Sequence, residues 1–372
     1  MDPFGIAGER TIAEISADFE GCRFCWALSA SGQRFPSNAM VWSDTDYVLL
    51  PALGALVPEH LLLVSRHHTS CVASLNGEQL MLLATTLAKV REEVVRRVAS
   101  SWVFFEHGST LASSVKACCI DHLHIHLIPL DHDLATDIAH RTSTPAVPLG
   151  SLAGILSETG SEPCNYILIE NTDRSLWVIK PPAYPSQYVR QVIASRLGIA
   201  TQWDWRDYPR IEHNISMLRR LRQLRVAPRQ IYFAHAIEGV PHDVLVGEIQ
   251  AVRSAFVAGG TDITVASMYD LFEQSRASPM EAKVLVSREI EFLKSCDALV
   301  VDLSRPGWQY AGALMEIVYA KVHHLPVIAI VGKSNLGERV WIRAHVDHRV
   351  QSLTEAVEVT RGILAKNNNQ SL

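Results

Sequence analysis

Three histidines alternate with aliphatic residues in one short segment, His122-Leu123-His124-Ile125-His126. In a β-strand, successive side chains point to opposite faces, so the three imidazoles share one face and the aliphatic residues share the other. An apolar strand face is normally covered by the protein core. The alternation therefore predicts a strand that is buried on one side and offers three imidazoles to one site. A histidine-rich surface strand is the alternative.

Length and charge limit the kind of protein this is. The chain has 372 residues, 48% of them hydrophobic, which is typical of two or more globular domains. Its formal net charge of -5 gives no overall basic field, so a small polar ligand is favoured over nucleic acid or a membrane. We find no apolar run near the roughly 20 residues that span a bilayer and no signal-peptide pattern. We therefore expect a cytoplasmic protein with reduced thiols.

The first half of the sequence has the pattern of an α+β domain. One long amphipathic segment, from about Leu75 to about Val98, predicts a helix among several short apolar runs that predict strands. The predicted strands are Met40–Val41, Tyr47–Pro51, His60–Val64, Val103–Phe105, His122–Ile128 and Tyr166–Glu170. Together they predict an antiparallel sheet with helices on one side.

After Pro228 the pattern changes to alternating strands and helices. Short apolar runs of this kind are typical of strands buried on both faces, and they predict a doubly wound parallel sheet of the flavodoxin or Rossmann type. The runs are Ile231–Ala234, Ile263–Ser267, Ala298–Leu303 and Val327–Val331. We place the domains at residues 1–225 and 229–366, followed by a disordered tail over 367–372.

The histidine segment and an upstream cysteine pair indicate two kinds of chemistry. A neutral imidazole is a good nucleophile toward phosphorus, and neighbouring imidazoles can donate hydrogen bonds to phosphate oxygens or hold a metal, which suits nucleotidyl transfer. Cys22 and Cys25 have the spacing of a zinc-ligand pair, for which His60 and His122 are candidate partners. Packing and thiol–disulfide exchange are the alternatives for the cysteines.

Four phrases of the first half resemble the histidine triad (HIT) superfamily of nucleotide hydrolases and transferases. They are Cys22-Arg23-Phe24-Cys25, Pro58 to Val64, Phe105-Glu106-His107-Gly108 and His122 to Ile128. The resemblance covers roughly residues 20 to 135. It implies that His124 attacks the α-phosphorus and forms a nucleotidyl-histidine, and that His126 stabilises phosphate oxygens. It also implies a structural zinc ion bound by Cys22, Cys25, His60 and His122.

The chain departs from this family around the triad. His107 stands where many relatives have asparagine, and the glycine followed by glutamine or serine that precedes the triad in relatives is missing. The selectivity for a leaving group is therefore open, with His107 as a candidate substrate-binding residue. Ser113 and Ser114 could supply phosphate hydrogen bonds or merely satisfy backbone groups of a turn.

Other residues of the first half have less specific interpretations. His67 and His68 are expected to cap or line the next segment rather than react. Trp203 and Trp205 lie in an extension that resembles that of one bacterial branch of the family. They could stack on a base, although aromatic pairs near a domain junction are more often packing.

In the second half, carboxylates surround a predicted buried strand. Asp302 ends this strand, and Glu316 lies in the early turns of a helix that starts near Gly312. A partly desolvated glutamate can attack an anomeric carbon or stabilise an oxocarbenium-like centre, while a second carboxylate handles protons. The alternative is structural, with Asp302 capping the loop and Glu316 favouring the helix start.

This half resembles the nucleoside 2-deoxyribosyltransferase superfamily over about residues 229 to 365. The matching phrases are Ile231–Ala234, Cys296–Asp302, Gly312–Ala320 and Leu325–Ile328. The resemblance implies that Glu316 is the nucleophile. It places Tyr232, Asp297 and Asp302 around the sugar and base, and it makes Gly312, the first residue of the Gly-x-x-x-Glu phrase, a further substrate-binding candidate.

Two departures bear on the substrate of this half. His235 stands where nucleotide-cleaving members cradle the 5′-phosphate, so the choice between nucleoside and nucleotide is open. Tyr310 stands where some transferases carry an aspartate, which argues against the deoxyribosyl-transfer branch.

Together the two resemblances predict a bifunctional nucleotide-processing enzyme without an organic cofactor. The first domain would cleave a nucleotide derivative at its α-phosphate, and the second would cleave or transfer the N-glycosidic bond of a nucleoside 5′-monophosphate or nucleoside. The alternative is that only one domain is catalytic and the other is a nucleotide sensor or an assembly module. The second resemblance also implies a homo-oligomer through the second domain, because family members complete their sites across a subunit interface.

Overall fold

The computed structural model describes residues 21–29, 38–110, 120–160, 162–224, 226–258, 263–269 and 282–366. Ser113 and Ser114 lie outside the described residues, and so does the predicted tail over 367–372. The chain divides into two compact units, one ending at Met217 and the other beginning at Leu218. This division falls within helix α8 (Ile211–Gln223) rather than in the loop at Pro228. None of the helices in the described ranges has the length and apolarity needed to span a membrane.

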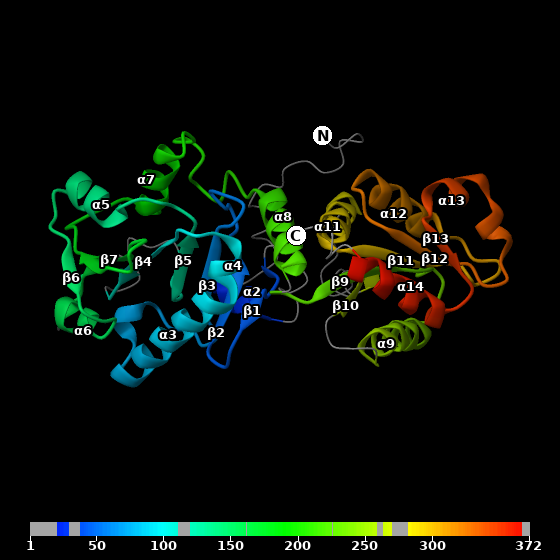
Figure 1. Ribbon diagram of the computed structural model, residues 1–372, viewed down its shortest axis with the longest axis horizontal. Helices are drawn as coiled ribbons and strands as arrows, with labels where there is room; N and C mark the ends of the chain where they lie inside the picture. Colours follow the sequence, from blue (N-terminus) through cyan, green and yellow to red (C-terminus); the bar gives the residue numbers. More distant parts are fainter. Residues whose placement is uncertain are drawn as a thin grey trace. The chain divides into compact units, whose positions relative to one another are not determined.

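The first unit is built on an eight-stranded antiparallel sheet with the order β1-β2-β3-β5-β4-β7-β8-β6 (Figure 1). Its strands are β1 (Trp42–Ser43), β2 (Tyr47–Pro51), β3 (Leu61–Ser65), β4 (Val103–Ser109), β5 (His124–Ile128), β6 (Val147–Leu149), β7 (Asn165–Glu170) and β8 (Leu176–Ile179). The predicted antiparallel sheet is therefore confirmed. The sequence missed β6 and β8, because both are short and partly exposed and so lack a continuous apolar run.

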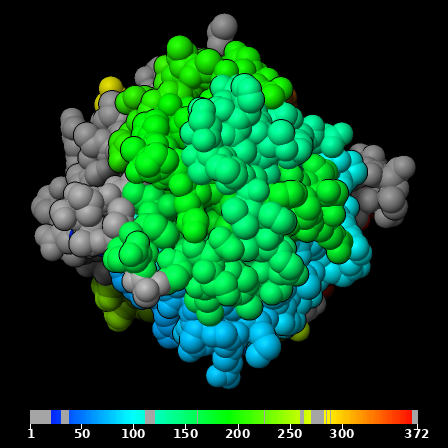
Figure 2. Space-filling model, turned by 90° about the vertical axis from the view of Figure 1, so that its left-hand side faces the viewer, coloured from blue at the N-terminus to red at the C-terminus, as the bar shows by residue number. Residues whose placement is uncertain are grey.

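The predicted long helix of the first unit is observed as one helical run that begins at Gly77. Asn76 caps its start in a capping box, since the Asn76 side chain accepts from the Gln79 amide and the Gln79 side chain accepts from the Asn76 amide. The run comprises α3 (Gly77–Val90), the π-helical turn η4 (Arg91–Val95) and α4 (Arg96–Val98). The other helices of this unit are α2 (Arg23–Ala27), η3 (Val72–Ser74), α5 (Leu134–Thr142), α6 (Gly154–Thr159) and α7 (Tyr188–Arg196). The face seen in Figure 2 is formed mainly by the green segments that follow β5.

The second unit is built on a five-stranded parallel sheet with the order β10-β9-β11-β12-β13. Its strands are β9 (Arg229–Ala234), β10 (Ile263–Ser267), β11 (Ala298–Asp302), β12 (Val327–Ile330) and β13 (His348–Val350). Its helices are α9 (His242–Ala258), α11 (Ala282–Ser295), α12 (Ala311–Val322), η6 (Asn335–Glu338), α13 (Val340–His345) and α14 (Leu353–Lys366). The predicted parallel sheet is confirmed, and β13 was missed because His348 and Arg349 of this edge strand are exposed.

Helices cover both faces of this sheet. In Figure 1, α9 and α14 lie on one face, where they contact each other, and α11 and α12 contact each other on the opposite face. The strand order reverses between β9 and β11, because β10 lies on the far side of β9 while all later strands follow β11. In parallel sheets such a reversal opens a crevice at the carboxyl ends of the strands, where ligands bind.

Candidate functional site

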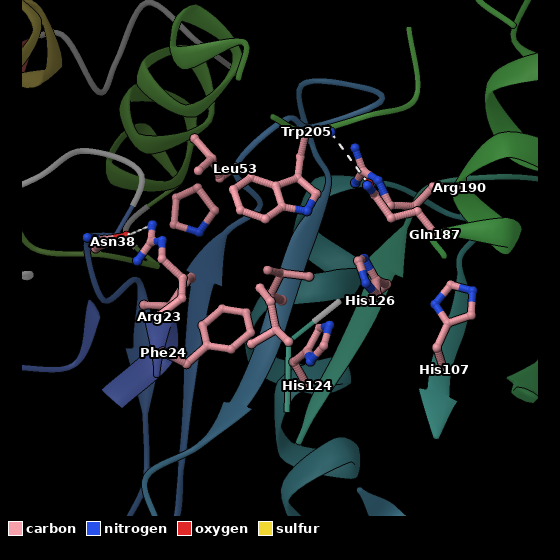
Figure 3. A pocket seen from close by; sticks show the side chains of 14 residues that line it. Arg23, Phe24, Asn38, Leu53, His107, His124, His126, Gln187, Arg190 and Trp205 are labelled. Atoms are coloured by element: carbon pink, nitrogen blue, oxygen red, sulfur yellow. Dashed lines mark hydrogen bonds between the residues drawn. The ribbon is translucent and has the colours of Figure 1, made fainter. Parts of the chain in front are cut away.

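One pocket of the first unit joins histidines of β4 and β5 to aromatic and basic side chains (Figure 3). It is lined by Arg23, Phe24, Asn38, Leu50, Pro51, Leu53, Leu62, His107, Ile120, His124, His126, Gln187, Arg190 and Trp205. β4 and β5 are neighbours, with Phe105 opposite His126 in the register. Alternate residues of a strand share a face, so His107 and His124 fall on the same side as this pair. Of the three triad imidazoles, His124 and His126 line this pocket and His122 does not.

The hydrogen bonding of His124 leaves one ring nitrogen available as a nucleophile. Its Nδ1 lies 2.7 Å from the carbonyl oxygen of His122. A carbonyl can only accept, so Nδ1 carries the proton, and Nε2 of the neutral ring keeps its lone pair. Burial lowers the pKa of His124 to about 4, even though the same backbone hydrogen bond opposes the shift. The imidazole is therefore neutral near pH 7.

A second chain of hydrogen bonds sets the tautomer of His126. The Leu56 amide donates to Nδ1 of His60 at 3.3 Å, so the proton of His60 is on Nε2, which lies 2.9 Å from Nδ1 of His126. His60 donates in this contact, and His126 then carries its own proton on Nε2. Burial lowers the pKa of both rings well below the usual range, and Phe105 stacks on His126 at a centroid distance of 4.4 Å. His126 is thereby fixed as a neutral N–H donor.

Two further side chains of this pocket involve α7. Arg190 lies in this helix, and His107 of β4 contacts its first turn. The Val189 amide donates to Nε2 of His107 at 3.0 Å, and burial lowers the pKa of His107 to about 3. Arg190 is buried and donates to the carbonyl oxygens of Gly54 and Trp203 at 2.6 and 2.9 Å. Its positive charge contributes to the lowered pKa of His107, His124 and His126. Sequence reasoning missed Arg190, because no local pattern connects it to the histidines.

Next to this pocket lies a group of two cysteines and two histidines. One ligand atom from each of Cys22, Cys25, His68 and His122 lies within 4.8 Å of the others. Nδ1 of His122 is 3.3 Å from Sγ of Cys22 and 3.7 Å from Sγ of Cys25, and Nδ1 of His68 is 3.4 Å from Sγ of Cys25. Zn–S bonds of about 2.3 Å and Zn–N bonds of about 2.0–2.1 Å at tetrahedral angles place S and N about 3.6 Å apart. The spacing therefore fits a tetrahedral zinc site.

The protonation of this group also fits a metal. Nε2 of His122 lies 2.8 Å from the Ser65 carbonyl oxygen, so this nitrogen donates and Nδ1 faces the sulfurs as a possible ligand. Burial alone would raise the pKa of Cys22, but hydrogen bonding to His122 and to backbone amides outweighs it and lowers the pKa to about 6. Burial and the neighbouring Cys22 raise the pKa of Cys25. The Cys22 thiolate accepts this hydrogen bond from His122 Nδ1, so the sulfur and Nδ1 share one proton, which a bound metal would displace.

The fourth member of this group corrects one prediction. The family resemblance implies His60 as the fourth ligand, and His68 is expected only to cap or line the next segment. In the structure His68 joins the cysteines, while His60 is fully buried and directed at His126. The two histidines lie on opposite sides of β3, one before its first residue and the other after its last. The turn after β3 brings His68 toward α2.

The second unit has a pocket of its own at the carboxyl ends of its strands. It is lined by Phe233, Ala234, His235, Ala236, Ile237, Glu238, Gly239, Val240, His242, Leu245, Met268, Tyr269, Gln309, Tyr310, Ala311, Gly312, Ala313 and Glu316. The predicted residues His235, Gly312 and Glu316 are therefore brought together. The pocket follows β9 and includes the start of α12, as expected for a crevice at the strand reversal.

Three buried polar groups meet at the end of this pocket. The Tyr232 hydroxyl lies 2.9 Å from the Glu316 carboxyl and 3.1 Å from that of Glu289 on α11. Burial raises the pKa of Glu316 well above the usual range, and the adjacent Glu289 raises it further, so this site favours the protonated form of Glu316. Sequence reasoning missed Glu289, because its segment reads as an ordinary amphipathic helix.

Tyr232 contacts Glu316 without lining this pocket, and two other predicted residues of the second unit, Asp297 and Asp302, also lie outside its lining. Asp297 precedes β11 and so sits at the amino end of the sheet, where it binds Arg229 at 3.0 Å and lies 3.8 Å from Arg222. Its predicted role beside the sugar and base is therefore corrected to a buried ion pair. The Asp302 carboxylate accepts from the Ser304 amide at 2.8 Å, as in the structural alternative. In the described part of the chain, Glu289 and not Asp302 is the carboxyl group beside Glu316.

Comparisons with known proteins find similarity in part of the first unit. Residues 26–140 match the family model described as scavenger mRNA decapping enzyme C-term binding. No curated protein matches the chain. A conserved protein from Enterococcus faecalis V583 is 18% identical, with a TM-score of 0.28, and the match covers 39% of this chain and 100% of that one.

Two further solved structures are similar at the same level. A HIT family hydrolase from Clostridium thermocellum is 18% identical, with a TM-score of 0.22, over 30% of this chain and 92% of that one. Yeast Ap4A phosphorylase in complex with Ap4A is 15% identical, with a TM-score of 0.25, over 42% of this chain and 65% of that one.

Proposed function

We propose that the first unit cleaves a nucleotide derivative at its α-phosphate through a nucleotidyl-histidine intermediate. The observation that carries this proposal is the fixed tautomer of His124, which leaves a neutral Nε2 available in a pocket beside an N–H donor on His126. The match of residues 26–140 to a family of decapping enzymes supports a nucleotide as the substrate.

The reaction follows from these protonation states. Nε2 of His124 attacks the α-phosphorus, a nitrogen–phosphorus bond forms, and the bond to the leaving group breaks. The N–H of His126 and the charge of Arg190 stabilise the negative charge on the phosphate oxygens. Water then cleaves the nitrogen–phosphorus bond and releases the nucleoside monophosphate, which restores neutral His124.

Cys22, Cys25, His68 and His122 are the residues that would hold a zinc ion beside this site. When bound, zinc supplies a structural cross-link between α2, the segment after β3 and the start of β5. His122 lies two residues before His124, the first residue of β5, and its carbonyl oxygen fixes the His124 tautomer. We therefore expect the metal to hold His124 in place without touching the substrate.

Trapping the intermediate tests this function. The purified chain is mixed with adenosine 5′-phosphoramidate or diadenosine tetraphosphate, quenched in denaturant at neutral pH and digested for mass spectrometry. We expect an adenylyl group on the peptide that contains His124, and none with His124→Asn. Turnover that persists in His124→Asn would show that another residue is the nucleophile.

The second unit supports a second candidate function, which is cleavage of the N-glycosidic bond of a nucleoside or its 5′-monophosphate. The supporting observation is the pair of carboxyl groups, Glu289 and Glu316, on the hydroxyl of Tyr232. For Glu316 to attack the anomeric carbon, it must first pass its proton to a neighbour, and Glu289 is in place to receive it. The glycosidic bond then breaks, the base leaves with a proton, and water releases the sugar from Glu316.

Release of free base tests this second function. The chain is given the four ribonucleosides, the four deoxyribonucleosides and their 5′-monophosphates, and the products are separated by liquid chromatography. Free base from the wild type and none from Glu316→Gln would support a glycosidase. A requirement for an added acceptor base would indicate base exchange. Binding without turnover by the second unit would indicate a nucleotide sensor.

Self-association through the second unit stays a prediction. Exposed apolar side chains on α12 and α13 support it, since Met315 is 63% exposed, Val340 79% and Trp341 72%. Light scattering after size-exclusion chromatography tests it, and Trp341→Glu should then shift the oligomer toward the monomer.

A further inference from the structure

A segment outside the family-matched region forms part of the first pocket. Residues 203–210, here called the strap, follow α7 and contribute Trp205 to the pocket wall. The two tryptophans of the strap have different surroundings. Trp203 packs against the apolar core cluster, whereas Trp205 lines the pocket that contains His124 and His126. Core packing accounts for a tryptophan at position 203. It does not account for one at position 205, where the side chain lines the pocket.

Polar contacts from α7 hold the strap over the pocket. Gln187 donates from Nε2 to the Asp204 carboxylate at 3.0 Å, and its Oε1 lies 3.5 Å from the Trp205 amide. Arg190 donates to the carbonyl oxygen of Trp203 and also to that of Gly54. Gln187 itself has a left-handed backbone with φ of 59°, which costs free energy for a residue other than glycine. The strap is therefore held at several points, and one of them is strained.

The other side of the strap fits closely against Gly54. This glycine has φ of +65°, and a Cβ atom there would lie 2.5 Å from Cβ of Trp205, so no larger residue can be accommodated without moving the tryptophan. The Gly54 amide donates to the Pro209 carbonyl oxygen at 2.7 Å. Arg210 also donates to the carbonyl oxygens of Ala55 and Leu56 at 3.1 and 3.2 Å. The indole is thus positioned before any ligand binds.

The pocket then has two chemically different parts. The histidines of β4 and β5 and the guanidinium of Arg190 suit phosphate. Across the pocket in Figure 3, Trp205 lies on the opposite side from Phe24 and His124, next to Leu53. The guanidinium of Arg206 lies over the Trp205 ring, 5.3 Å from its centroid, so one face of the indole is covered by a side chain of the strap itself. An indole held in this way at the wall of a phosphate site can stack on an aromatic base with its other face.

We propose that Trp205 is the base-recognition residue of this pocket, stacking on the nucleobase while the α-phosphate lies at His124. The proposal rests on the proposed function of the first unit and names the part of the substrate that gives it specificity. Gln187, Arg190 and Gly54 act as positioning residues for the strap.

A pair of substrates that differ only in the base tests the proposal. Adenosine 5′-phosphoramidate and ribose 5-phosphoramidate have the same reacting group, and only the first can stack. We expect Trp205→Leu to lower kcat/KM for the adenosine compound by about 5- to 150-fold, mainly through KM, and to leave the ribose compound unchanged. Trp205→Phe keeps an aromatic face and should lose much less. Trp177→Phe makes the same substitution at a half-buried tryptophan outside the pocket, and it is the matched control for Trp205→Phe.

Two outcomes would overturn the proposal. Equal losses with both substrates would mean that Trp205 only supports the fold, and no loss with either would mean that the base is bound elsewhere. If the wild type cleaves neither substrate, the proposed function fails, and binding then decides the inference separately. Adenosine monophosphate should quench the tryptophan fluorescence of the wild type more than ribose 5-phosphate does, and Trp205→Leu should abolish this difference. If the two ligands quench the wild type equally, or if their quenching still differs in Trp205→Leu, the base does not stack on Trp205.

Discussion

The two pockets keep buried titratable groups uncharged by different means. In the first unit His60, His107, His124 and His126 each have one tautomer, because a carbonyl, an amide or the next ring determines which nitrogen carries the proton. In the second unit two carboxyl groups meet at one tyrosine hydroxyl, and Glu316 stays protonated. Burial therefore has opposite effects on the reactivity of the two proposed nucleophiles, His124 and Glu316. It leaves the nucleophile of the first unit ready, since neutral imidazole has a lone pair, whereas it leaves that of the second unit inactive until a proton moves.

Reciprocal inactivation is the strongest test of this comparison and has the largest expected effect. His124→Asn should lower the rate of α-phosphate cleavage by about 10⁴- to 10⁶-fold, because the nucleophile is lost. It should leave base release from a directly supplied nucleoside unchanged, and Glu316→Gln should do the reverse. Initial rates of both reactions are measured by chromatography on the same protein preparations. Loss of both activities in either variant would mean that the two pockets do not work independently.

Replacing Asp297 tests how much a buried ion pair of the second unit contributes to stability, because Asp297 does not line the pocket. Asp297→Asn leaves the buried Arg222 and Arg229 without their carboxylate, and we expect the free energy of unfolding to fall by about 3–5 kcal/mol. Glu338→Gln removes an exposed ion pair with Arg349 and should cost about 0–1 kcal/mol. Urea unfolding measures both variants. Similar losses in the two variants would show that the Asp297 pair contributes no more than a surface pair.

Separate replacement of two histidines of the first unit tests which of them binds the metal and which fixes the tautomer of His126. His68→Ala should remove bound zinc, because it deletes a ligand of the Cys22–Cys25 group. His60→Ala should keep the zinc and lower α-phosphate cleavage by about 100-fold, because His126 loses the partner that fixes its tautomer. Elemental analysis and rate measurements on the two variants decide this. Zinc lost from His60→Ala and retained in His68→Ala would restore the original assignment.

Both reactions should lose activity as the pH falls, but in different pH ranges, because burial shifts the pKa of His124 down and that of Glu316 up. The pKa of His124 is lowered to about 4, so the nucleophilic neutral form persists well below pH 6.5, and kcat/KM for α-phosphate cleavage should fall only as the pH approaches 4. Burial and the neighbouring Glu289 raise the pKa of Glu316 well above the usual range, so its carboxylate form, and base release with it, should increase only as the pH rises through that raised pKa. Rates at constant ionic strength measure both profiles. An acid limb near pH 6.5 for the first reaction would contradict the burial of His124.

Local patterns of the sequence predicted the two kinds of sheet. Period-two alternation identified the histidine strand, and β2 and β10 have the predicted bounds. These elements are readable because the pattern of burial along a strand depends on its own residues. Spacing also indicated a metal site at Cys22 and Cys25, since two ligands on one helical turn are a local feature.

The partners of these residues were decided only by the tertiary structure. His60 and His68 flank the same strand, and only the path of the chain after β3 places the second of them at the cysteines. Glu289, Arg190 and Trp205 reach their pockets from separate helices and a strap, so no spacing in the sequence connects them to Glu316 or His124. The sequence by itself determined the two kinds of sheet and most of their strands, although not β6, β8 or β13, and it indicated candidate reactive residues on them. The tertiary structure decided which nitrogen of each histidine carries a proton and which carboxyl groups share a site, because both depend on contacts between segments far apart in the chain.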